Sequence, residues 1–210
     1  MTTDITDLVR TETSRLADVL DGLDEAGWTA ASLCAGWSVR DLTAHLLMPY
    51  ELSVPSFLLR MLRARFDFDA VADRLAREDP RDHRELVAAL RTTPQRRFNV
   101  PGAPAEAPLS HLVIHAEDVY RPLGLDPAVE PRALDAALAQ STRRPFVAKG
   151  LLDGLTLATT DSAFRLGDPA GAAAVGGPAR ALLGVVAGRP AGLAELTGPG
   201  VERLRERLPA

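Results

Sequence analysis

Apolar residues recur at helical spacing through the first 145 residues, and this periodicity favours a mainly α-helical fold. The pattern is clearest from Ile5 to Leu23, where charged residues fill most of the positions between the apolar ones. The apolar positions in that stretch are Ile5, Leu8, Leu16, Val19, Leu20 and Leu23. Such a stripe predicts an amphipathic helix with one buried face.

A second helix is expected to begin at Ser38, an N-cap type of residue with Asp41 three positions later, as in a capping box. Pro49 and Pro55 predict a kink or a break in this helix, because proline disrupts helical hydrogen bonding. The segment 92–108 contains four prolines and a glycine, which predicts a long connecting loop. Further helical stretches are expected over 57–91, over 109–123, and from Pro131 to a point before Pro145.

After Gly150 the helical periodicity gives way to short strand-like runs. Residues 155–160 and 163–166 are typical of short strands, and the Ala/Gly-rich stretch 170–177 is interpreted as a turn. An apolar helix is expected to open at Gly177-Pro178 and run through Val186, followed after Gly188 by a last amphipathic helix that ends at Leu208. We therefore predict a helical bundle over residues 1–150 and a small α/β domain over 151–210.

Composition and charge exclude several classes of protein. Hydrophobic residues make up 46% of the 210 residues, so a buried core is feasible. The net charge of -4 argues against a nucleic-acid-binding surface. The sequence contains no run of about 18 uncharged apolar residues, so we expect no membrane span. The first ten residues lack the apolar core of a secretory signal. The lone cysteine, Cys34, fits a reducing compartment, so we expect a soluble cytoplasmic protein.

Three of the four histidines are candidate metal ligands. His111 and His115 stand at positions i and i+4 of one expected helix, which places their side chains within roughly 40° of each other around its axis. His45 lies on the inner stretch of the second helix and could meet the pair across a bundle. Spacing alone leaves open the alternative that these are hydrogen-bonded core histidines. His83 is flanked by charged residues, and we expect it to be solvated and without a role.

Two sequence blocks resemble the mycothiol-dependent maleylpyruvate isomerase-like family of the DinB superfamily. The block LCAGWSVRDLTAHL at residues 33–46 is similar to the pattern C-x-G-W-[ST]-V-R-D-[LV]-x-A-H-L. The block HLVIHAEDVYRPLG at residues 111–124 is similar to [EH]-x-x-x-H-x-x-D-x-x-R-x-x-G. The stretch 177–189 more loosely resembles the small α/β unit appended to many members. The resemblance covers nearly the whole chain.

This resemblance implies a DinB-like four-helix bundle followed by a small C-terminal α/β unit. It implies a divalent metal ion, with zinc favoured over nickel and other ions, held by His45, His111 and His115. Some isomerase-type relatives have glutamate where this chain has His111, so the particular isomerase activity does not follow. The implied partners are a small thiol, mycothiol, and a small electrophilic substrate. We expect thiol-dependent S-transfer or isomerisation by a monomer or a homodimer.

Four further residues have alternative roles. Asp41 and Asp118 are either helix caps and surface ion-pair partners, or acceptors that orient the second ring nitrogen of a ligand histidine. Arg189 could hold a substrate carboxylate, or could be solvated. Cys34 is interpreted as a small buried residue near Trp37, which packs the end of the bundle, rather than as a nucleophile.

Two other functions share the same metal ligands. In a metal-dependent hydrolase, a metal-bound hydroxide would replace the thiolate. In a non-enzymatic DinB-like binding or stress-response protein, the metal site would be structural. The sequence does not separate these alternatives, whereas the requirement for an added thiol would.

Overall fold

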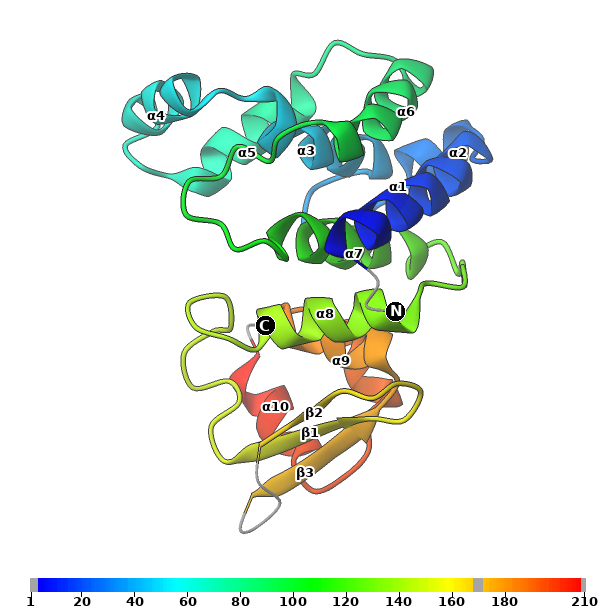
Figure 1. Cartoon of the computed structure of the whole chain (residues 1–210), viewed down its shortest axis with the longest axis vertical. Helices are drawn as coiled ribbons and strands as arrows, with labels where there is room; N and C mark the ends of the chain where they lie inside the picture. The colour runs from blue at the N-terminus through cyan, green and yellow to red at the C-terminus, as the bar shows by residue number, and fades with distance from the viewer. Residues whose placement is uncertain (1–3, 168–171, 209–210) are drawn as a thin grey trace. The chain divides into compact units, whose positions relative to one another are not determined.

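The computed structural model describes residues 4–167 and 172–208, which are mainly helical with a small three-stranded sheet (Figure 1). Contacts divide the chain into two compact units. One comprises Met1–Pro108 and Asp118–Pro127, and the other comprises Leu109–Glu117 and Ala128–Ala210. Helix α7 (Ala107–Tyr120) is continuous and contributes residues to both.

The first unit is a set of helices, all but one of which bury residues in the core; the helix Val54–Arg63 buries none. In chain order they are α1 (Ile5–Asp21), α2 (Glu25–Thr29), α3 (Val39–Glu51), α4 (Val54–Arg63), α5 (Phe68–Arg77), α6 (His83–Thr92) and the short 3-10 helix η1 (Thr93–Gln95). Helix α1 packs against α6, and α3 packs against α5 and α6. The predicted stripe of the first helix is confirmed, since Leu16 and Leu20 are fully buried.

Local capping explains where these helices begin and end. Ser38 is the N-cap of α3, as predicted, and α3 continues through Pro49 to Glu51. The predicted break then follows, because Ser53 caps a new helix, α4, with proline in its first turn. The expected helical character of 57–91 is confirmed, and the segment is divided among three helices. Asp67 and Asp82 each accept a hydrogen bond from the third residue beyond them, so two further helices start there.

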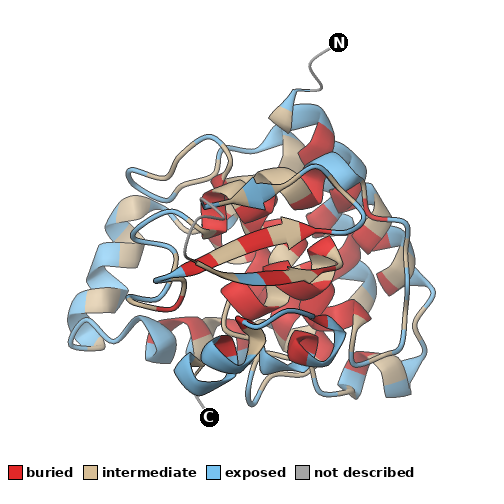
Figure 2. Ribbon diagram, turned by 90° about the horizontal axis from the view of Figure 1, so that it is seen from below, coloured by how far each residue is buried: buried red, intermediate tan, exposed pale blue. Residues whose placement is uncertain are grey.

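The second unit combines helices with the sheet. Its elements are α8 (Pro131–Ser141), β1 (Leu155–Thr159), β2 (Arg165–Leu166), β3 (Ala173–Gly177), α9 (Ala179–Val186), the 3-10 helix η2 (Pro190–Glu195) and α10 (Val201–Arg207). The strand order is β2-β1-β3, with β1 parallel to β3 and antiparallel to β2. Helix α9 lies between α8 and the sheet (Figure 1). Buried positions alternate along β1, as Figure 2 shows.

Strand β3 overturns the interpretation of 170–177 as a turn. Residues 173–177 pair with β1 in parallel register, Leu155 opposite Ala173, while 170 and 171 lie outside the described residues. The small residues there serve close packing. A Cβ on Gly177 would lie 2.5 Å from Cδ2 of Leu196, which is too close for any other residue type to fit without movement. The expected last helix is also divided, into η2 and α10.

The predicted fold class, mainly α with a small C-terminal α/β unit, is confirmed. The domain boundary near residue 150 stays a prediction, because compactness alone does not test which part folds independently. Helix α8, which precedes that position, groups with the sheet. Among the described residues, no helix has the length and apolar character needed to cross a bilayer.

Candidate metal centre

His45 is fixed on α3 by the cap at the start of that helix. The backbone N–H and the hydroxyl of Ser38 donate to Asp41 at 3.0 and 2.7 Å, and the backbone N–H of Asp41 donates back to the Ser38 hydroxyl at 3.2 Å. His45 lies one turn beyond Asp41 and is buried, with 7% of its surface exposed, next to the fully buried Leu42. The cap therefore sets the rotation of the helix that carries this imidazole into the core.

The indole ring of Trp37 packs against the imidazole ring of His45. The two ring centroids are 4.8 Å apart and the planes are tilted by 49°. The indole N–H donates to Asp73 on α5 at 2.9 Å, and Arg77 donates to the same carboxylate at 2.7 Å. These hydrogen bonds, from Arg77 first and then from Trp37, lower the pKa of Asp73. Trp37 is thus anchored on one side while it contacts a candidate ligand on the other.

His111 and His115 lie one turn apart on α7. Their ring centroids are separated by 4.8 Å, and the rings meet edge to face at 82°. Both side chains are partly exposed, whereas Leu112 and Val113 between them are buried. The i, i+4 spacing predicted from the sequence therefore presents both imidazoles on one face of this helix.

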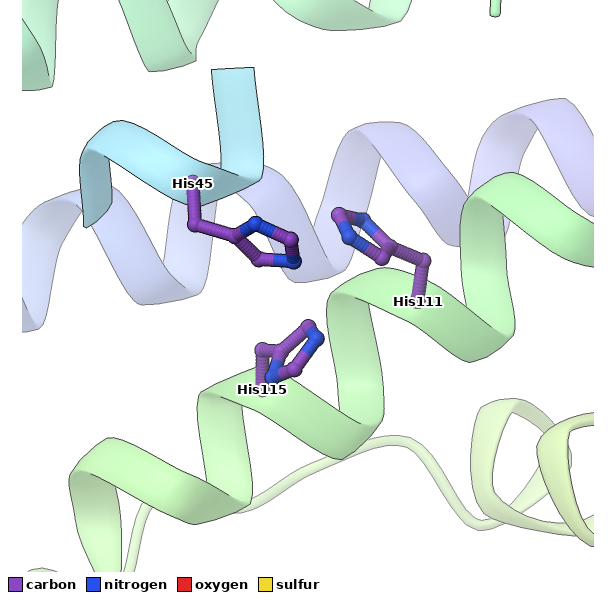
Figure 3. Close-up of side chains that lie close together, drawn as sticks. All are labelled: His45, His111 and His115. Atoms are coloured by element: carbon purple, nitrogen blue, oxygen red, sulfur yellow. The ribbon is translucent and has the colours of Figure 1, made fainter. Parts of the chain in front are cut away.

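The three candidate histidines come together (Figure 3). His45, His111 and His115 each offer one ring nitrogen, and these nitrogens all lie within 4.8 Å of one another. Ligand nitrogens around a tetrahedral zinc ion are separated by roughly 3.3 Å, given zinc–nitrogen bonds of about 2.0–2.1 Å. Small side-chain adjustments would bring the three nitrogens to this spacing, so the donor set fits a divalent transition metal.

Cys34 and Asp118 form a second group beside this one. The Cys34 thiol donates to the Asp118 carboxylate at 3.2 Å, and the backbone N–H of Leu33 donates to the Asp118 carbonyl at 3.0 Å. A sulfur of Cys34, a nitrogen of His115 and a carboxylate oxygen of Asp118 also lie within 4.8 Å of one another. Cys34 is half-buried and Asp118 is buried, at 1% exposure.

The remaining predicted residues have mixed outcomes. The Asp41 carboxylate takes part in the cap of α3, which was one of its two expected roles. The Arg189 guanidinium donates to the Ala187 carbonyl, and its role toward a substrate stays a prediction. The expectation that His83 is simply solvated is wrong. Its ring stacks on Trp28 with centroids 4.4 Å apart and planes 4° from parallel, which leaves 28% of its side chain exposed.

Sequence reasoning missed two buried polar pairs on α7. Arg180 on α9 donates to Glu117 at 2.7 Å, with 19% and 5% of the respective side chains exposed. Ser110 donates to Gln140 on α8 at 2.6 Å, and both are buried. The sequence feature that could have predicted the ion pair is Arg180, the only charged residue of the otherwise apolar α9. These pairs tie the histidine-bearing helix to its neighbours.

Comparison with known proteins agrees with this architecture, which is a DinB-like helical fold with an appended α/β unit. The profile described as "Mycothiol maleylpyruvate isomerase N-terminal domain" matches residues 9–120, just over half of the chain. The chain belongs to this family, and the resemblance inferred from the two sequence blocks is confirmed.

Two solved structures are similar to the chain. One is the mycothiol-dependent maleylpyruvate isomerase, and the other is a mutant of that isomerase in which alanine replaces one histidine. In each comparison the identity is 18%, the match covers 93% of this chain and 91% of the other, and the TM-score is 0.52. At this identity the likeness shows a shared fold. A comparison with curated proteins gives no significant match.

Proposed function

We propose that this protein is a metal-dependent enzyme that uses a low-molecular-weight thiol, mycothiol, on a small electrophilic substrate. The thiolate would add to an electrophilic carbon. The π electron pair of the attacked double bond would move to the adjacent carbonyl. Protonation of this carbanion by water, with the C–S bond kept, gives S-transfer, whereas rotation about the former double bond and expulsion of the thiolate give isomerisation. The observation that carries this proposal is the convergence of His45, His111 and His115 in a chain that belongs to the isomerase family.

The donor set supports a divalent ion with room for further ligands. Three imidazoles from two helices leave coordination positions open, as catalytic zinc sites do. Imidazole suits zinc, nickel and other divalent ions, and we favour zinc. When bound, the ion would lower the pKa of a coordinated thiol so that the thiolate is present at neutral pH.

The chain's own residues would hold and orient this site. His45, His111 and His115 would serve as ligands and not as proton shuttles. Asp118, three residues after His115 on α7, would orient that imidazole through its carboxylate. Arg189 is the candidate for binding a substrate carboxylate. We propose that the enzyme acts in the cytoplasm as a monomer or a homodimer, with no nucleic-acid partner.

The test is turnover with and without an added thiol. The zinc-loaded protein would be assayed with maleylpyruvate and other small electrophiles, with mycothiol present or absent. We expect turnover that requires mycothiol and is lost in the H111A/H115A double variant. The H83A variant is the matched control and should keep full activity, because His83 lies outside the cluster. Turnover without thiol would instead indicate a hydrolase, and no turnover at all would favour a binding protein.

A further inference from the structure

Cys34 is held next to a candidate metal ligand by two contacts with one residue of α7. Its thiol donates to the Asp118 carboxylate at 3.2 Å, and the adjacent Leu33 N–H donates to the Asp118 carbonyl at 3.0 Å. His115 stands one turn before Asp118 on the same continuous helix. The position of the sulfur relative to His115 is therefore fixed through α7 itself.

The side chains that meet here form a second set of metal donors. Sulfur of Cys34, nitrogen of His115 and oxygen of Asp118 lie within 4.8 Å of one another, and His115 also belongs to the three-histidine set. A thiolate, imidazole and carboxylate set suits zinc, cobalt and cadmium. His115 is common to both sets, so an ion that both sets bind through the same ring nitrogen of His115 would have either protein sulfur or further imidazoles within reach.

We propose that Cys34 is an internal thiol ligand, which binds the ion together with His115 and Asp118 while no small thiol is present, and that Asp118 orients the His115 imidazole only once a small thiol has displaced the sulfur. On binding, the S–H bond breaks, its proton is released to water, and the sulfur lone pair forms the bond to the ion. No electron is transferred in this step. The proposal rests on the proposed function in one respect, namely that the ion is the one bound by His115.

This arrangement gives the protein a built-in competitor of its co-substrate. Sulfur from Cys34 takes the coordination position that a small thiol would use, so an entering thiol must displace it. The bound ion is thereby shielded from other ligands until the co-substrate arrives. Replacing Cys34 by serine should therefore tighten binding of the small thiol.

The experiment uses Co²⁺ alone as the probe, with a phosphine reductant and no added thiol. Cys34 is the chain's single cysteine, so a thiolate-to-cobalt charge-transfer band in the near ultraviolet can only report this residue. We expect the band in the wild-type protein and its complete loss in C34S, while both bind one Co²⁺. We also expect the H45A/H111A variant, checked for folding by circular dichroism, to keep the band through the second set.

The outcomes separate this proposal from the proposed function. Wild-type protein that binds one Co²⁺ without the band would overturn the role of Cys34 and leave the three-histidine site in place. A band that disappears in H45A/H111A together with Co²⁺ binding would also overturn the second set, since His115 and Cys34 remain in that variant. Absence of Co²⁺ binding by the wild-type protein would overturn both proposals.

Discussion

Replacing Arg180 by methionine tests the ion pair that fastens α7 to α9. The guanidinium Nε lies 2.7 Å from Oε1 of Glu117, and the two side chains are 19% and 5% exposed. Methionine preserves much of the side-chain volume but removes the charge. The variant therefore leaves a buried carboxylate without this cation, and the free energy of unfolding should fall.

The magnitude follows from the burial of the pair. Removing one partner of a buried ion pair costs about 3–5 kcal/mol, and the partial exposure of Arg180 favours the lower end, about 3 kcal/mol. For a chain of this length the loss corresponds to a decrease in Tm of roughly 6–12 °C. The matched control is R74M. Arg74 pairs with Glu78 at 3.6 Å with both side chains more than 70% exposed, so the loss there should stay below about 0.5 kcal/mol.

Urea unfolding followed by far-ultraviolet circular dichroism measures both effects. The E117Q/R180M double variant should recover most of the stability lost in R180M, because it removes both charges together. If R180M is as stable as R74M, the pair does not fasten α7 and the reasoning from its burial is wrong.

Two further predictions concern the packing around the site and the sheet. Because hydrogen bonds, chiefly from Arg77, lower the pKa of Asp73, its carboxylate stabilises the fold above the unfolded-state pKa of about 4. D73N should therefore be less stable than wild type in urea at pH 7, and the difference should fade as the pH falls below that value. G177A should lose about 1–3 kcal/mol in the same assay, since its Cβ would lie 3.0 Å from the backbone carbonyl oxygen of Glu195 as well as 2.5 Å from Cδ2 of Leu196. The matched variant is G184A, in the middle of α9, where an added Cβ would lie 3.9 Å from Cβ of Arg189. Its free energy of unfolding should rise by up to about 1 kcal/mol. Equal effects of the two alanines would contradict the packing argument.

Several elements that position the site could be predicted from the sequence. Apolar periodicity predicted α1, and the Ser38–Asp41 pair predicted the start of α3, because capping depends on neighbouring residues only. The i, i+4 spacing predicted that His111 and His115 share one face of α7. The inclusion of His45 needed more than spacing, since its meeting with α7 depends on tertiary structure. The family motif supplied that step.

Other features could not be predicted because they depend on distant contacts. Strand β3 is rich in small residues that are typical of turns, and the close contacts of Gly177 with Leu196 and the Glu195 carbonyl depend on tertiary structure. The division of 57–91 depended on caps at Asp67 and Asp82, which stand among many other charged residues. The Glu117–Arg180 pair joins residues 63 positions apart, and neither shows an obvious partner in the sequence.

Zinc binding by single histidine variants tests the central claim most directly. Isothermal titration of metal-free protein with zinc, checked by elemental analysis, should give one ion per chain for wild type and for the control H83A. In the C34S background, which removes the alternative sulfur ligand, H45A, H111A and H115A should each bind zinc at least about 100-fold more weakly than C34S alone, since loss of an outer hydrogen-bonding partner alone costs about 10–100-fold. The affinity of C34S in all three variants, or an equal loss in H83A, would contradict a metal centre built from these three imidazoles.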